Sequence, residues 1–180
     1  MKKKILVTRK LLIENEEKLK ELFDVKLNSK DELYTSDKII ELSKDCDGIL
    51  SAITDQFNKD LIEKLSPSIK IIANFAVGFG NINVDAAAKK NIVVTNTPEV
   101  LDDSTADISI LLLLGASRKV LEARRAAELQ NWKWSADFML GKQMSNKRLG
   151  ILGMGRIGRA VAKRARGFNM EIHYHNRSQL

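Results

Sequence analysis

Three glycines near the end of this 180-residue chain constrain its fold more than any other feature. They occur in the segment LGILGMGRIGRAVAKRARGFNMEIHYHNRSQL, which covers residues 149–180. The GxGxxG spacing alone is weak evidence because it arises by chance. Here it follows a short apolar strand and opens a helix, and a second strand comes after that helix. This context predicts a dinucleotide-binding β-α-β unit.

Each glycine has its own predicted role. Gly153 permits the tight turn from strand to helix, Gly155 lets the backbone approach a pyrophosphate, and Gly158 lets the helix pack closely on the strand. The backbone amides of Arg156 and Ile157 would then face the phosphates from the helix N-terminus. The alternative is a purely structural strand–turn–helix that binds no ligand.

The residues after the second strand predict which dinucleotide is preferred. An acidic side chain there would accept hydrogen bonds from the ribose 2′-OH of NAD. This chain has no acid at that point and has Asn176, Arg177 and Ser178 instead. Arg177 offers a planar fork for a 2′-phosphate, with the other two as further donors. We therefore expect NADP, with NAD less favoured; the alternative is that Arg177 is only a solvated surface arginine.

The positive charge of the chain lies in the same segment. Residues 142–180 contain nine Lys and Arg but one acid, whereas residues 1–141 contain 21 basic and 22 acidic side chains. This excess suits a phosphate-bearing ligand. It would also suit nucleic acid, but no aromatic platform or DNA-binding motif accompanies it. We therefore expect no nucleic acid partner.

The remaining sequence alternates predicted strands and helices, which indicates an α/β fold with a parallel sheet. The spacing predicts one long helix over 103–129, nearly all apolar in its first half, and an irregular arm over 131–147. The boundary between two α/β units is expected near 97–103. The predicted strands are 4–8, 24–27, 47–52, 70–77, 91–95, 148–152 and 171–174, and the predicted helices are 11–23, 36–43 (with Ser36 as N-cap), 58–65, 84–90 and 156–168.

Composition indicates the cellular compartment of the protein and excludes some kinds of site. A single cysteine, Cys46, excludes a disulfide framework and a multi-thiolate metal site, and it favours a reducing cytoplasm. The apolar run at residues 5–7 is too short for a signal peptide, and the run at 108–114 cannot span a bilayer. We expect a cytoplasmic protein with no membrane partner and no metal.

The sequence resembles the D-isomer-specific 2-hydroxyacid dehydrogenase family, and within it the glyoxylate/hydroxypyruvate reductases. The resemblance rests on ANFAVGFGNINVD (73–85), on VTNTPEVL (94–101) with STAD (104–107), and on residues 150–178. It implies a flavodoxin-like substrate domain over 1–98. It also implies that 99–180 contain a connecting helix, a dimer arm and the start of a Rossmann domain, with catalysis between the two domains.

The resemblance also implies ligand-binding residues. Val77 and Gly78 would hold the carboxylate of a small 2-oxo or 2-hydroxy acid through backbone amides, and Ser51 would face the same cleft. Thr105 would lie near the nicotinamide. The alternatives are that Gly78 serves only a turn and that Thr105 only caps a helix. The family often has aspartates where this chain has Gly80 and Asn83, which puts the substrate loop in doubt.

In the family, hydride transfer uses an arginine, a carboxylate and a histidine that lie well downstream of the second nucleotide-domain strand. The only histidines here, His173 and His175, are on the adenosine side, so we assign no catalytic residue. We expect the N-terminal part of an NADP-dependent reductase that is inactive alone. The alternatives are a non-catalytic dinucleotide-binding or interaction protein, or one half of a split enzyme. By resemblance, the 103–147 helix and arm, with Trp132 and Trp134, would form a homodimer; the alternative is a monomer that buries these aromatics internally.

Overall fold

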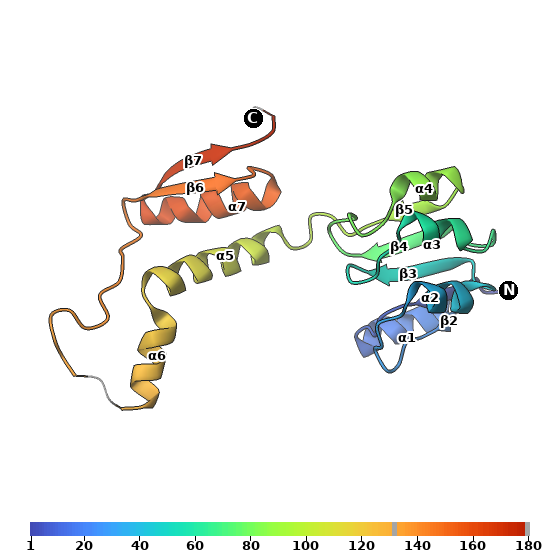
Figure 1. The fold of residues 1–180 in the computed structure, drawn as a ribbon, viewed down its shortest axis with the longest axis horizontal. Helices are drawn as coiled ribbons and strands as arrows, with labels where there is room; N and C mark the ends of the chain where they lie inside the picture. Colours follow the sequence, from blue (N-terminus) through green and yellow to red (C-terminus); the bar gives the residue numbers. More distant parts are fainter. Residues whose placement is uncertain (131–132, 179–180) are drawn as a thin grey trace. The chain divides into compact units, whose positions relative to one another are not determined.

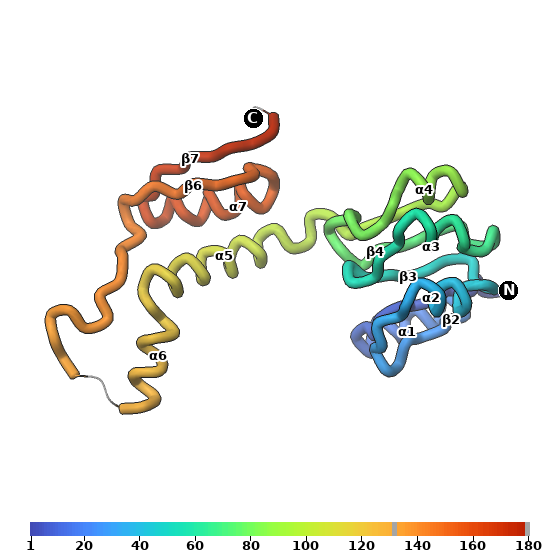
Figure 2. Tube along the Cα trace, viewed as in Figure 1, coloured from blue at the N-terminus to red at the C-terminus, as the bar shows by residue number. Residues whose placement is uncertain are grey.

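A computed structural model describes residues 1–130 and 133–178. The chain divides into two compact units, Met1–Val100 and Leu101–Leu180. Figures 1 and 2 trace the first unit in blue to green and the second in yellow to red. Each unit is an α/β structure.

The first unit is built on a five-stranded sheet in which every neighbouring pair is parallel. The spatial order of the strands is β2-β1-β3-β4-β5. This is the flavodoxin-like order, so the expected parallel α/β fold of this unit is confirmed. The strands are β1 (Lys4–Val7), β2 (Asp24–Lys26), β3 (Gly48–Ala52), β4 (Ile71–Phe75) and β5 (Val93–Thr95).

Four helices accompany this sheet (Figure 1). They are α1 (Ile13–Leu22), α2 (Ser36–Ser43), α3 (Lys59–Lys64) and α4 (Val84–Lys89). The core joins Leu6, Ile49 and Ile72 from the strands to Ile39 of α2 and Leu61 of α3, all at most 1% exposed. Helix α1 has no buried residue. The hydrophobic core therefore lies between the sheet and α2, α3 and α4.

Side-chain caps fix where three of these helices begin. Asn58 and Asn83 accept hydrogen bonds from the third amide of α3 and α4, at 2.9 Å each. The expected cap of α2 at Ser36 is wrong by one residue. Thr35 is the N-cap, and its hydroxyl accepts from the Lys38 amide at 3.3 Å. Thr35 is the capping residue because its backbone is extended (ψ 162°), as an N-cap requires, whereas Ser36 is already helical.

The second unit contains a two-stranded parallel sheet of β6 (Arg148–Leu152) and β7 (Glu171–His175). The helix α7 (Arg156–Ala165) and a 3₁₀ turn (Arg166–Phe168) connect the two strands, which confirms the expected β-α-β arrangement. Two further helices precede it, α5 (Asp102–Ser117) and α6 (Val120–Glu128). Within the described ranges, no helix combines the length and apolarity needed to cross a membrane.

The expectation of one long helix over 103–129 is wrong. The helix is broken between α5 and α6, where Lys119 adopts a left-handed conformation with φ 53°. The carbonyl of Ser117 accepts a hydrogen bond from the Lys142 amide at 2.7 Å, so a residue from the returning chain replaces the next helical turn. Gly141 makes this approach possible, since a Cβ there would lie 2.5 Å from the Ser117 oxygen. A contact between distant segments therefore overrides local helix propensity.

The described part of the expected irregular arm, residues 133–147, contains neither helix nor strand. Trp134 is 85% exposed, and Phe138 and Leu140 are also exposed. Trp132, which we also expect to serve the arm, lies outside the described residues.

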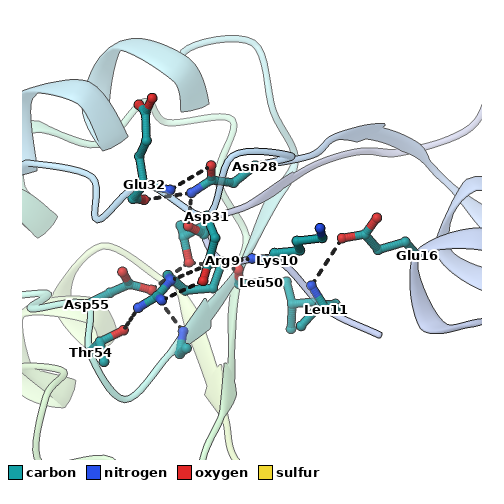
Figure 3. A network of polar contacts seen from close by, with 12 residues as sticks. Arg9, Lys10, Leu11, Glu16, Asn28, Asp31, Glu32, Leu50, Thr54 and Asp55 are labelled. Atoms are coloured by element: carbon teal, nitrogen blue, oxygen red, sulfur yellow. Dashed lines mark hydrogen bonds and ion pairs between the residues drawn. The ribbon is translucent and has the colours of Figure 1, made fainter. Parts of the chain in front are cut away.

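At the carboxyl edge of the first sheet, polar contacts tie together the loops that follow β1, β2 and β3 (Figure 3). The Arg9 guanidinium donates to both carboxylate oxygens of Asp31, at 2.8 and 3.0 Å, and to the Thr54 hydroxyl at 2.7 Å. The amide of Lys10 adds a further bond to Asp31. The Arg9 guanidinium, and after it the Lys10 amide, hold the pKa of the Asp31 carboxyl at about 2, well below its usual range.

This depressed pKa predicts acid sensitivity of the first unit. Between about pH 4 and pH 2 the unfolded chain takes up a proton on Asp31 before the folded chain does, so stability falls as the pH is lowered. We expect Asp31→Asn to be less stable than the parent at pH 7 and to lose less stability between pH 4 and pH 2. Urea unfolding across this range measures it, with the exposed Asp60→Asn as control. Equal pH slopes for the parent and Asp31→Asn would contradict the prediction.

Candidate functional site

The turn between β6 and α7 places its glycines under different constraints. Gly153 has φ +96°, a conformation that L side chains rarely adopt. A Cβ on Gly158 would lie 2.3 Å from the carbonyl oxygen of Gly153, so this helix packs onto the strand only with glycine there. The fold of the second unit itself therefore requires both residues.

Gly155 is different, because nothing in the described chain requires it to be glycine. Its φ is −76°, and a Cβ built on it would meet no described atom within 4 Å. Gly155 is the N-cap of α7, but it has no side chain to satisfy the first amides of the helix, which include those of Arg156 and Ile157. The turn thus combines an open backbone surface with helix N-terminal N–H groups, an arrangement suited to a phosphate.

The segment predicted to select the cofactor directly follows β7. The side chain of Asn176 donates to the carbonyl of Ser178 at 3.1 Å, which forms a small turn. Arg177 within this turn is exposed and has no acidic partner among residues 1–130 and 133–178. His173 on β7 contacts Glu171 of the same strand at 2.8 Å. The guanidinium of Arg177 is therefore available to an added phosphate.

Helices α5 and α7 are joined by ion pairs. Arg164 contacts Asp107 at 2.5 Å and Asp103 at 3.0 Å, and Arg156 lies 3.4 Å from Asp102. These pairs fix the beginning of α5 beside the glycine turn. They also show that the side chain of Arg156 helps hold α5, while its predicted contact with phosphate is through the backbone.

Thr105 lies in the first turn of α5 and is half-buried. The N-cap of α5 is Leu101, and no side chain caps this helix. The capping alternative for Thr105 is therefore wrong. Its role toward a nicotinamide stays a prediction.

In the first unit, the predicted substrate residues lie at the carboxyl edge of two paired strands. Ser51 of β3 is opposite Asn74 of β4 in the parallel register. Ser51 is 2% exposed, and its hydroxyl donates to the Asn74 side-chain oxygen at 3.1 Å. Ser51 thus lies beneath the loop that follows β4, and its direct contact with substrate stays a prediction.

The loop over residues 76–80, here called the β4 loop, contains Val77 and Gly78. The side-chain amide of Asn96 donates to the Val77 carbonyl at 2.7 Å, and that of Asn74 donates to the Gly78 carbonyl at 3.0 Å. A Cβ on Gly78 would meet no described atom within 4 Å, and Gly78 does not have a positive φ. The turn alternative for this glycine therefore has no support in the backbone conformation.

Asn81 completes the buried support of the β4 loop. Its side chain bonds to Asn74 and donates to the Asp55 carbonyl at 2.9 Å. Sequence reasoning did not single out Asn74, Asn81 or Asn96. The available signal was an asparagine at the carboxyl end of β4 and another just after β5, where polar side chains can reach a ligand-facing edge.

The two departures from the family pattern have local explanations. Asn83 caps α4 through its side-chain oxygen, which is a role that an aspartate also fills. A Cβ on Gly80 would meet no described atom within 4 Å, so the fold tolerates a larger residue there.

Cys46 lies before β3, at the opposite end of that strand from Ser51. Burial raises the pKa of the Cys46 thiol, whose sulfur lies 3.6 Å from the Leu42 carbonyl oxygen. Such a thiol is a weak nucleophile. Within the described residues, no group of three potential His, Cys, Asp or Glu ligands gathers around a point.

Comparison with known proteins identifies relatives along the whole chain. A glyoxylate reductase of Korarchaeum cryptofilum is 45% identical over 179 residues, covering 98% of this chain and 53% of the relative. A D-isomer specific 2-hydroxyacid dehydrogenase structure from Polaromonas has a TM-score of 0.89 at 38% identity, covering 100% of this chain and 57% of that chain. This chain thus spans about half the length of the curated relatives it matches.

A third relative has a structure with ligands. The NADPH-dependent glyoxylate/hydroxypyruvate reductase of Sinorhizobium meliloti, in complex with NADP and malonate, has a TM-score of 0.79 at 29% identity. All of this chain aligns with 55% of that one. The profile of the D-isomer specific 2-hydroxyacid dehydrogenase catalytic domain matches residues 5–171. Together with the two-unit α/β fold, this match places the chain in the D-isomer specific 2-hydroxyacid dehydrogenase family, whose members are oxidoreductases.

Proposed function

We propose that this chain forms the substrate domain and the first β-α-β unit of the nucleotide domain of an NADP-dependent 2-hydroxyacid dehydrogenase of the glyoxylate/hydroxypyruvate reductase type. The relatives named above as glyoxylate reductase and glyoxylate/hydroxypyruvate reductase support this reaction class. The observation that carries the proposal is Gly155, an open glycine at a helix N-terminus that the described chain does not itself require.

In this proposal, residues of the second unit bind the cofactor and residues of the first unit bind the substrate. The amides beside Gly155 hold the cofactor pyrophosphate, and Thr105 lies toward its nicotinamide end. Val77 and Gly78 hold the substrate carboxylate through their amides, above the buried Ser51. The cofactor, when bound, supplies the hydride that reduces the carbonyl carbon of a small 2-oxo acid. The chain itself binds and orients, and we assign none of its residues to proton transfer.

The preference for NADP over NAD rests on the segment after β7. Arg177 is exposed and without an acidic partner in the described chain, and Asn176 and Ser178 shape the turn around it. No carboxylate is present in this turn to accept bonds from a ribose 2′-OH. A guanidinium fork matches the geometry of a phosphate and would therefore bind the 2′-phosphate of NADP.

A cytoplasmic homodimer is part of the same proposal. The free thiol of Cys46 fits a reducing compartment. Exposed apolar side chains gather on α5 and α6, including Ile108, Leu111, Leu112 and Leu121. A second copy of the chain would cover such a surface, and Trp134 on the arm would extend it.

Substitutions in the glycine turn separate ligand binding from folding. Gly155→Ser keeps a good N-cap residue but places a side chain where the pyrophosphate would lie, so we expect unchanged stability and loss of NADPH binding. Gly158→Ala creates a backbone clash, and we expect a destabilisation of about 1–3 kcal/mol. Thermal unfolding and NADPH fluorescence titration measure the two effects. NADPH binding by Gly155→Ser as tight as that of the parent would contradict the assigned role.

The cofactor preference predicts a selective effect of Arg177→Ala. Loss of a charge-assisted contact to the 2′-phosphate should weaken NADPH binding by about ten-fold and leave NADH binding unchanged. Titration of both dinucleotides measures the ratio, with Arg125→Ala on α6 as a control for loss of one exposed arginine. An equal effect on NADPH and NADH would refute the assignment of Arg177.

We assign no catalytic residue within residues 1–180, and this assignment predicts that these residues alone are inactive. We expect no NADPH-dependent reduction of glyoxylate or hydroxypyruvate by the purified 180-residue chain. A fusion to the part of the Korarchaeum cryptofilum relative that follows the matched region should reduce glyoxylate with NADPH. The consumption of NADPH, followed by the absorbance of the reduced nicotinamide, measures both. Turnover by the unfused chain would refute the first expectation.

The same assay separates the alternatives. Activity on mixing the unfused chain with the separate second segment would favour one half of a split enzyme. A correctly folded fusion that binds NADPH but reduces neither acid would favour a non-catalytic dinucleotide-binding or interaction protein.

A further inference from the structure

The β4 loop has an unusual distribution of hydrogen bonds along its backbone. Four consecutive carbonyls accept bonds from the chain, those of residues 76 to 79. Their donors, in the same order, are the Thr97 amide at 2.8 Å, the Asn96 side chain at 2.7 Å, the Asn74 side chain at 3.0 Å and the Ile82 amide at 3.0 Å.

The amides of the same loop show the opposite pattern. No described residue accepts a hydrogen bond from the backbone N–H of Val77, Gly78, Phe79 or Gly80. Because Gly78 and Gly80 also have open space where a Cβ would lie, a ligand can approach the loop backbone there. The carbonyl groups of the loop thus bond to the protein, whereas its N–H groups are available to a ligand.

Planarity of the peptide links the two patterns. The carbonyl of one residue and the N–H of the next belong to one rigid trans unit and point in opposite directions. The bond from Asn96 to the Val77 carbonyl therefore sets the direction of the Gly78 N–H. In the same way, the bond from Asn74 to the Gly78 carbonyl sets the direction of the Phe79 N–H.

We propose that Asn96 and Asn74 are positioning residues for the carboxylate site of the β4 loop. Asn96 orients the Gly78 amide, and Asn74 orients the adjacent Phe79 amide, toward the carboxylate of the small 2-oxo or 2-hydroxy acid that Val77 and Gly78 are proposed to hold. This inference rests on the proposed function, because it assumes that the β4 loop receives the substrate carboxylate. Neither asparagine touches the substrate. Each holds one peptide plane in its binding orientation, so the loop loses little conformational freedom when a carboxylate arrives.

The two asparagines differ in how cleanly they can be tested. Asn74 is 2% exposed and also bonds to Ser51 and Asn81, so its removal leaves buried polar groups unpaired and lowers stability. Asn96 is half-buried, and its side chain makes one hydrogen bond within the described residues, to the Val77 carbonyl. Asn96→Ala is therefore the primary variant and Asn74→Ala the second.

The test follows backbone amide signals of the ¹⁵N-labelled 180-residue chain by NMR during titration with glycolate, against sodium chloride at matched ionic strength. We expect glycolate, but not chloride, to shift the amides of Val77, Gly78 and Phe79. Asn96→Ala should weaken glycolate binding about three- to ten-fold, which is the worth of one hydrogen bond, and reduce the Gly78 shift most. Asn74→Ala should reduce the Phe79 shift most. Asn15→Ala on α1, an exposed asparagine, should bind like the parent.

The outcomes distinguish the inference from the function on which it rests. If glycolate shifts none of these amides in the parent chain, or if chloride shifts them equally, both the carboxylate site and the positioning roles are overturned. If the parent binds glycolate and a folded Asn96→Ala chain binds it equally tightly, only the positioning roles are overturned. A lower melting temperature of Asn96→Ala with an unchanged affinity counts against the inference in the same way.

Discussion

The need to satisfy buried polar groups at the carboxyl edge of the first sheet governs the conformation of the β4 loop. Asn74 and Asn81 lie under that edge, 2% and 7% exposed, and bond to each other and to neighbouring backbone carbonyls. A buried side-chain amide without partners would be costly, so the two asparagines and the loop hold one another in place. The conformation of the β4 loop is therefore a consequence of the polar layer beneath it.

Much of the fold follows from local sequence patterns. Alternating apolar strands and amphipathic helices gave the β-α-β units, and the glycine spacing located the turn at residues 153–158. The break at Lys119 could not be predicted in this way, because the bond that ends α5 comes from Lys142, 25 positions beyond Ser117. Local propensity favours a continuous helix there, and a contact with a distant segment decides otherwise.

The candidate site likewise contains residues that a sequence motif predicts and residues that only the pairing of strands brings together. The backbone amides of Val77 and Gly78 could be named from a motif, because the family resemblance marks them. The side chains that we propose to orient the Gly78 and Phe79 amides could not, since Asn74 and Asn96 are brought to one loop only by the pairing of β4 with β5. Ser51 illustrates the opposite case: the predicted strand over 47–52 contains it, but the pattern did not show that it is buried and donates to Asn74 of the neighbouring strand.

The glycines of the two units fall into two groups, those that the fold requires and those at the proposed anion-binding sites. Gly153 and Gly158 are demanded by the fold, through a positive φ and a close backbone contact, whereas Gly78 and Gly155 are not. The latter two are open glycines beside N–H groups, one in each unit. Recognition through amides requires no cationic side chain, so the carboxylate site proposed here is compatible with the 21 basic and 22 acidic side chains of residues 1–141. Under the proposed function, a basic side chain is needed chiefly where the 2′-phosphate of NADP must be distinguished from the 2′-hydroxyl of NAD, which is the role proposed for the exposed Arg177.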